Sequence, residues 1–216
     1  MGISGLLEYA GPVIYASLAL CALYGLFCVV LLLLRVGQKK FKNEAAAADF
    51  LTAVRERMDQ RDFEGAAEIC DQPEYWAKAL PQMVMLAITE KDRPLPALRR
   101  YLEERFERDV LADLEYRLSW VGTIVKSAPM LGLLGTVSGM IGAFAKIANT
   151  AKSGTDPAAL ANDISFALFT TAMGLAVAIP LTILGAFVRV RIGRLTDSTM
   201  QHLSEFLDDF EVARRA

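Results

Sequence analysis

Thr136, Thr170 and Thr171 stand near the middle of long apolar stretches of this chain, where polar side chains are uncommon. Thr170 and Thr171 lie near the middle of residues 164–188, and Thr136 lies within residues 127–145; neither stretch contains a charge. A hydroxyl can relay a hydrogen bond or hold a water molecule, but it keeps no charge near neutral pH. Such groups could line a polar path through an apolar medium. A group that takes up and releases a proton would then have to come from another chain.

A structural role is the alternative for each threonine, because membrane threonines often donate to the carbonyl of residue i−4. On a helical projection, Thr136 lies within about 60° of the directions of Gly132 and Gly139. Thr171 lies on a small-residue face of the later stretch, whereas Thr170 is expected to point away from that face. The positions of Thr136 and Thr171 beside such faces make a functional role as plausible as a structural one.

Three uncharged stretches are long enough to cross a bilayer. Residues 13–34, 127–145 and 164–188 each approach or exceed the length of about 20 residues that a spanning helix needs. We expect an all-α membrane protein whose three transmembrane helices are residues 13–34, 127–148 and 164–188. A cleaved signal peptide is the alternative for the first stretch, but the preceding residues 1–12 contain no Lys or Arg.

Basic residues predict the orientation of these helices, because they favour the cytoplasmic side. The basic residues that follow the first and third stretches are Arg35, Lys39, Lys40, Lys42, Arg189, Arg191 and Arg194. We therefore place an N-terminal segment, residues 1–12, and a turn, residues 149–163, on the outer, periplasmic side. Residues 35–126 are expected to form a cytoplasmic helical region, and residues 189–216 a cytoplasmic C-terminal helix.

Two of the expected transmembrane helices continue beyond the apolar stretches. From Ala97 onward apolar residues recur at steps of four or three, and no Gly or Pro interrupts them before Gly122. Beyond Arg189 a heptad-like apolar seam continues to the C-terminus. We expect both helices to extend far into the cytoplasm as a long helical bundle. Residues 42–96 are expected to form shorter helices, one of them capped by Asp62.

Small residues predict close helix packing in the membrane. The second stretch carries glycines at steps of three, four and three, namely Gly132, Gly135, Gly139 and Gly142, and Gly174 lies on a similar face of the third stretch. Because one chain offers little surface to cover both faces, we expect a homo-oligomer. A generic packing interface is the alternative, and it would explain the glycines fully.

The remaining side chains offer little chemistry. Cys21, Cys28 and Cys70 show no metal-ligand spacing and are expected to be free thiols. His202 is the only histidine and is expected to be a solvated surface residue. We predict no catalytic residues, no metal and no cofactor. The stretch GLLGTVSG lacks the lysine of a P-loop, which argues against a nucleotide-phosphate site. The net charge of −2 gives no sign of the basic surface that binds nucleic acid.

Two stretches, APMLGLLGTVSGMIGAF (128–144) and DPAALANDISFALFTTAMGLAVAIP (156–180), together resemble the signature of the MotA/TolQ/ExbB proton channel family. The layout is also similar, with a short outer N-terminus, one span, a large cytoplasmic insertion and two further spans. The stretch AAEICDQ within the insertion and the compact length favour the ExbB/TolQ branch over the flagellar MotA branch.

The resemblance implies a ring of five such subunits in the bacterial inner membrane. The ring would surround single-span partners of the ExbD/TolR type, whose aspartate takes up and releases the proton. Protons would be the coupling ion, and a TonB/TolA-like envelope protein would receive the mechanical work. By the motif, pore-lining threonines fall on Thr136 and Thr171, and helix-shaping prolines fall on Pro129 and Pro180.

One position departs from the family pattern. Many ExbB and TolQ sequences have an acidic residue five positions before the threonine that Thr171 matches, and here that position is Phe166. Either this chain does without the carboxylate, or the partner or Asp163 at the mouth of the span replaces it. Phe166, Asp163 and Thr170 are therefore further candidates for the pore or its polar niche.

The implied function is that of a motor subunit that converts proton-motive force into mechanical work on the envelope. A Tol-type, gliding-type or other specialised motor of the same family is one alternative. A non-conducting membrane scaffold is another. An enzyme is the least supported class, because the spans lack catalytic residues.

Overall fold

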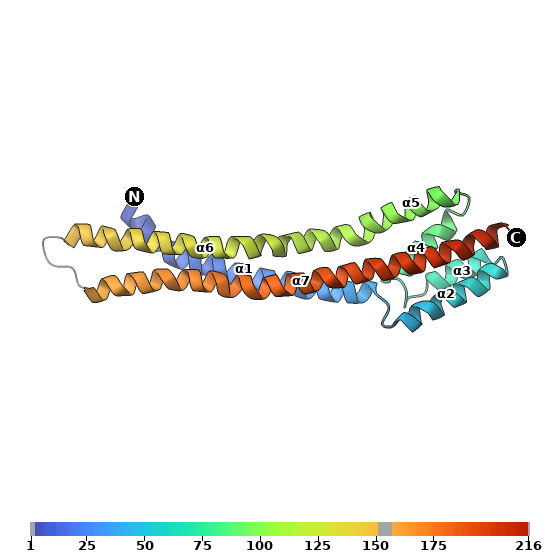
Figure 1. Ribbon diagram of the computed structural model, residues 1–216, viewed down its shortest axis with the longest axis horizontal. Helices are drawn as coiled ribbons and strands as arrows, with labels where there is room; N and C mark the ends of the chain where they lie inside the picture. Colours follow the sequence, from blue (N-terminus) through green and yellow to red (C-terminus); the bar gives the residue numbers. More distant parts are fainter. Residues whose placement is uncertain (1–2, 151–156, 216) are drawn as a thin grey trace. The chain divides into compact units, whose positions relative to one another are not determined.

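The described residues of the computed structural model, 3–150 and 157–215, form helices joined by turns (Figure 1). The helices are α1 (Ile3–Lys39), α2 (Glu44–Asp59), α3 (Phe63–Cys70), α4 (Ala79–Thr89), α5 (Leu95–Phe106), the π-helical segment η1 (Glu107–Leu111), α6 (Ala112–Thr150) and α7 (Pro157–Arg215). No strand occurs in these two described ranges, which confirms the all-α fold class.

Three helical stretches are long and apolar enough to cross a membrane, as predicted. They are Gly11–Lys39, Leu95–Ala148 and Leu160–Arg214. Because α5, η1 and α6 follow one another without a break, the helix that begins at Leu95 continues into the second apolar stretch. Of the turn expected at residues 149–163, residues 151–156 lie outside the described part of the chain. The described residues on either side are helical, because α6 ends at Thr150 and α7 begins at Pro157.

The chain divides into two compact units. The first unit combines the chain up to Val30 with Leu118–Phe187, and it contains the apolar stretches of α6 and α7. The second unit combines Leu31–Arg117 with the chain from Val188 onward, and it contains α2 to α5.

In the first unit, α1 packs against both α6 and α7. Ile14 and Leu18 of α1 form a buried cluster with Ala128 of α6 and Ala178 of α7. The side chains that face outward from these helices are largely apolar and exposed. This distribution is expected of helices whose outer faces contact lipid rather than water.

In the same unit, α6 and α7 lie side by side at backbone contact (Figure 1). A Cβ atom on Gly132 would lie 2.8 Å from the carbonyl oxygen of Thr170 and 2.9 Å from Cα of Thr171. A Cβ atom on Gly174 would lie 2.6 Å from the carbonyl oxygen of Ala128. A side chain of any size would therefore push the two helices apart, and glycine permits the contact.

Two further glycines of α6 extend this contact. A Cβ atom on Gly139 would lie 2.6 Å from Cβ of Ala167, and one on Gly135 would collide with the side chain of Thr170. By contrast, a Cβ atom on Gly142 would have no described neighbour within 4 Å. The small-residue faces of α6 and α7 therefore cover each other within one chain, and their close packing needs no second copy.

In the second unit, the short helices pack against the last part of α7. The ring of Phe63 meets that of Phe210 edge to face, with centroids 6.1 Å apart. Arg55 of α2 forms an ion pair with Asp209 of α7. Apolar burial and a surface charge pair thus hold the C-terminal helix against the insertion.

A row of apolar residues along α5, η1 and α6 stays buried, as the periodicity predicted. Leu98, Leu102, Phe106, Val110 and Leu114 are each 0% exposed, although they are spaced four apart. In a regular α-helix each four-residue step advances about 40° around the axis, so such a row drifts away from a fixed neighbour. The wider i→i+5 turn of η1 offsets part of this drift and keeps the row on one face.

His202 is 8% exposed, so the expectation of a solvated surface histidine is wrong. Its Nδ1 lies 2.7 Å from the carbonyl oxygen of Ser198, and its Nε2 lies 3.7 Å from a carboxylate oxygen of Glu44. His202 comes three residues after the buried Thr199 and four before the buried Phe206. It therefore lies on the buried seam of α7 instead of its outer face.

Two local predictions are confirmed. Asp62 caps α3 by accepting a hydrogen bond of 2.8 Å from the Gly65 N–H, and this bond lowers the pKa of the Asp62 carboxyl. The three cysteines are free thiols, and Cys70 is buried.

We expect the Cys70 thiol to resist alkylation in the folded protein. Burial raises its pKa to about 12, which leaves roughly one thiolate in 100,000 thiols at pH 7. Peptide mapping after a maleimide pulse would show no label on Cys70 until the protein is unfolded. As a control, Gln60→Cys at an exposed position should react at once; native labelling of Cys70 at a similar rate would contradict the described packing.

We expect Gly135→Ala to destabilise the protein and Gly142→Ala not to. Both changes favour a helix by up to about 1 kcal/mol, but overpacking typically costs about 1–3 kcal/mol. Only the Gly135 methyl group would meet a neighbour, the Thr170 side chain. Melting curves in detergent should show a lower Tm for Gly135→Ala alone. Equal Tm values for the two variants would refute the described contact between α6 and α7.

Candidate functional site

The candidate site lies in the first unit, where α6 and α7 meet inside their uncharged stretches. No ionisable side chain stands between Lys126 and Lys146, nor between Asp163 and Arg189. The polar groups available there are hydroxyls and backbone carbonyls. In the described part of the chain, no group of three His, Cys, Asp or Glu side chains is placed to hold a metal ion.

Thr170 ties the two helices together. Its side chain is 1% exposed, and Oγ1 lies 2.6 Å from the carbonyl oxygen of Ala167 and 3.0 Å from that of Gly132. A hydroxyl has one proton to donate, so Thr170 divides it between its own helix and α6. The expectation that Thr170 points away from the small-residue face is therefore wrong. Position 170 is three residues after Ala167 and four before Gly174, which places it on the face of α7 that meets α6.

Thr171 is the exception among the threonines of this site. Its Oγ1 atom is buried, yet it has no hydrogen-bond partner among the described residues. Leaving a buried hydroxyl without a partner costs about 1–3 kcal/mol. Buried hydroxyls without a protein partner are usually hydrogen-bonded to an ordered water.

Thr136 and Thr182 are satisfied locally. Thr136 Oγ1 donates to the carbonyl oxygen of Leu133 at 2.7 Å, and Thr182 Oγ1 donates to that of Ala178 at 2.8 Å. Donation to the preceding turn is the common structural use of a threonine in a membrane helix. Thr136 still has oxygen lone pairs free to accept a hydrogen bond.

Phe166 packs against α1. Its ring meets that of Tyr15 edge to face with centroids 5.2 Å apart, and a Cβ atom on Gly11 would lie 3.2 Å from it. The Tyr15 hydroxyl is buried and, like that of Thr171, has no partner in the described residues. Aromatic surface thus fills the position at which the family resemblance implied an acidic side chain. Sequence reasoning missed Tyr15, because its neighbours belong to a helix far along the chain.

Asp163 is paired at the end of the third apolar stretch. One of its carboxylate oxygens lies 2.7 Å from Nζ of Lys146, so the pair joins α6 to α7. The two candidate shaping residues, Pro129 and Pro180, lie inside α6 and α7. Each removes one backbone donor from its helix.

Comparison with known proteins identifies the family of this chain. Residues 74–201 match the sequence profile of the MotA/TolQ/ExbB proton channel family. A biopolymer transport protein ExbB homolog of Methanothermobacter thermautotrophicus is 40% identical over 97 residues, which cover 44% of this chain and 33% of that protein. The biopolymer transport protein exbB1 of Vibrio cholerae is 46% identical over 63 residues, which cover 29% of this chain and 26% of that protein.

The chain therefore spans about a third or less of these two relatives in the matched regions. The family profile, however, covers more than half of the chain and includes all the threonines of the site. The three apolar helices are those of a multi-pass membrane protein. This chain belongs to the MotA/TolQ/ExbB proton channel family, in its ExbB branch.

Proposed function

We propose that this chain is the ring-forming subunit of a proton-driven motor of the inner membrane. In this proposal Thr171, together with Thr136, forms the polar niche in which an aspartate of a single-span, ExbD/TolR-like partner ionises. The work would be passed to a TonB/TolA-like envelope protein. A homopentamer with a periplasmic N-terminus and a cytoplasmic C-terminus is the assembly that we infer.

The buried, unpartnered hydroxyl of Thr171 is the observation that carries this proposal. A carboxylate in an apolar site favours its protonated form, because burial disfavours the charge. A hydroxyl that donates to the carboxylate favours the ionised form. The Thr171 hydroxyl donates to no described group, whereas the hydroxyls of Thr170 and Thr136 donate to backbone carbonyls.

The two apolar stretches contain no ionisable side chain. This is consistent with a motor in which the partner supplies the titrating carboxylate and this chain supplies the polar niche. If the moving chain holds the titrating carboxylate, the ring needs only an apolar wall and a few polar niches. Each proton that crosses about 100 mV releases about 2.3 kcal/mol. A few protons would then supply the energy to move a partner helix past the packing barriers of the wall.

A non-conducting scaffold is the alternative from another functional class. It would explain the glycine contact and the apolar outer faces equally well, but it gives no reason for an unpartnered hydroxyl at Thr171. Proton uptake by vesicles that hold the chain with its co-purified partner separates the two. Uptake no faster than that of empty vesicles would favour the scaffold.

We expect Thr171→Val to abolish most proton uptake while leaving the protein folded. Valine keeps the shape of threonine but cannot form a hydrogen bond, and a lost bond to a charged group is worth about tenfold or more in rate. The matched control is Thr182→Val on the same helix, whose hydroxyl serves only the preceding turn. Equal uptake by both variants would assign Thr171 a packing role.

Thr170→Val should have the converse effect. It removes the hydroxyl that links α7 to the Gly132 carbonyl, so we expect a loss of about 1 kcal/mol in unfolding free energy. Proton uptake per folded complex should change little. A variant with unchanged Tm but strongly reduced uptake would move the functional hydroxyl from Thr171 to Thr170.

A further inference from the structure

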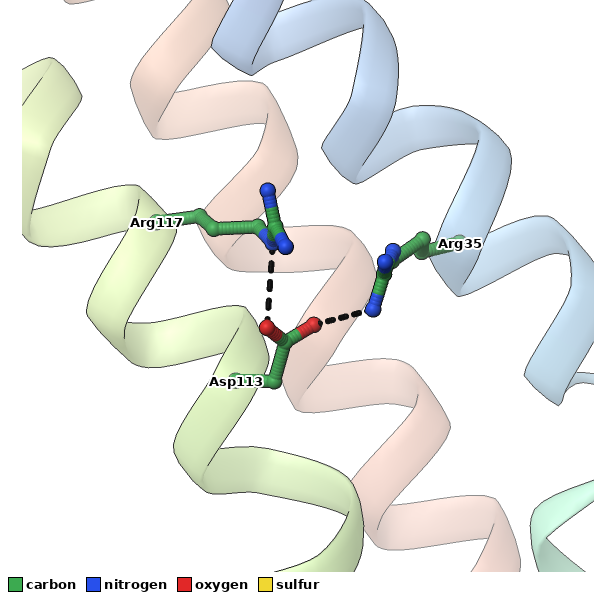
Figure 2. A network of polar contacts seen from close by, with 3 residues as sticks. All are labelled: Arg35, Asp113 and Arg117. Carbon is green, nitrogen blue, oxygen red and sulfur yellow. Dashed lines mark hydrogen bonds and ion pairs between the residues drawn. The ribbon is translucent and has the colours of Figure 1, made fainter.

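A cluster of charges lies where α1 ends, in the second unit (Figure 2). Arg35 of α1 and Arg117 of α6 both bind the carboxylate of Asp113, at N···O distances of 2.6 Å and 3.1 Å. In Figure 2 the two guanidinium groups approach the carboxylate from different sides, one to each oxygen. One negative charge is thus shared by two positive ones.

Both guanidinium groups keep most of their hydrogen-bonding capacity. Arg35 uses only Nη1 and Arg117 uses only Nε, and neither side chain has another hydrogen bond within the described ranges. A guanidinium carries five N–H donors in a planar fork that matches the oxygens of a phosphate group. Both side chains remain partly exposed, so an anion from outside could reach these donors.

Lys39 adds a third positive charge, one helical turn beyond Arg35. It is half-buried, and its ammonium group has no hydrogen bond or ion pair in the part of the chain that the structure describes. The charges that act on it are those of Asp113, Arg35 and Asp109. Asp109 already lies 3.3 Å from an Arg105 nitrogen. A half-buried cation without a partner is costly, and a bound anion would remove that cost.

The place of the cluster in the sequence suggests where that anion is found. Arg35 is the first charged residue after the apolar stretch 13–34. Tyr116, the neighbour of Arg117, is 64% exposed, and tyrosines are enriched where lipid headgroups meet water. Basic groups at the cytoplasmic surface attract anionic lipids. A phosphate held in a bilayer is therefore better matched to this site than one free in solution.

We propose that Arg35, Lys39 and Arg117 bind the phosphate group of an anionic phospholipid. Asp113 holds the two arginines in place and leaves a net positive charge for the headgroup. The site fastens the end of α1 to α6 through a lipid as well as through the ion pair. This inference depends on the membrane assignment but not on proton conduction, so it stands or fails separately from the proposed motor.

Native mass spectrometry of the full chain tests the proposal. The protein is held in detergent with equal amounts of phosphatidylglycerol and phosphatidylcholine that have identical acyl chains, and the ratio of the two bound lipids is measured. We expect the wild-type protein to favour phosphatidylglycerol. Lys39→Gln should lower the ratio about fivefold without lowering the Tm, because it breaks no bond within the described part of the protein. Lys39→Arg should restore it.

Arg100→Gln is the matched control, since it also removes one positive charge but from a side chain that is 82% exposed and paired with Glu104. Its lipid ratio should equal that of the wild type. If the lipid ratio fell equally in Arg100→Gln and Lys39→Gln, net charge alone would explain the preference, and the proposed site would be wrong. If sodium phosphate displaced phosphatidylglycerol and sodium chloride of equal ionic strength did not, the site would bind free phosphate. The proposal that it binds a phospholipid would then be wrong.

Discussion

The first unit depends on one constraint, the backbone contact between α6 and α7. In lipid, apolar burial gives little reason for two helices to associate, so close packing and interhelical hydrogen bonds must hold them. Gly132 and Gly174 allow that packing, and the Gly132 carbonyl accepts the bond from Thr170. The contact also fixes the height and direction of Thr171, because its Cα lies against Gly132. Packing and polar chemistry therefore share the same few residues.

This shared position gives two adjacent hydroxyls different tasks. The Thr170 hydroxyl donates to backbone carbonyls and stabilises the pair of helices. The Thr171 hydroxyl is buried and donates to no described group. The aromatic contact of Phe166 with Tyr15 fills the neighbouring position with apolar surface. A wall of this kind tolerates a neutral carboxyl along most of its length and favours its ionisation where an uncommitted hydroxyl is available. The proposed motor needs that contrast more than it needs charges of its own.

The sequence was sufficient to predict the helices, but it was insufficient to predict the direction in which some side chains point. Uncharged length predicted the three spans, and apolar periodicity predicted the buried row from Leu98 to Leu114. Thr170 and His202 were misplaced because one residue step turns a helix by about 100°, and the face that is buried depends on neighbours that periodicity does not name. The partner of Gly132 and Gly135 was ambiguous for the same reason, since a small-residue face looks alike whether its neighbour is the same chain or another copy.

The π-helical segment η1 bears on how the length of this protein can vary. A π turn contains one residue more than the α turn it replaces. Loss of a single residue within Glu107–Leu111 could therefore be absorbed by reverting to a regular helix, whereas the same loss within α6 would rotate every later side chain by about 100°. A deletion of one residue in this segment therefore need not disturb the faces on either side. The segment allows the chain before α6 to lose a residue while the glycine row keeps its alignment with α7.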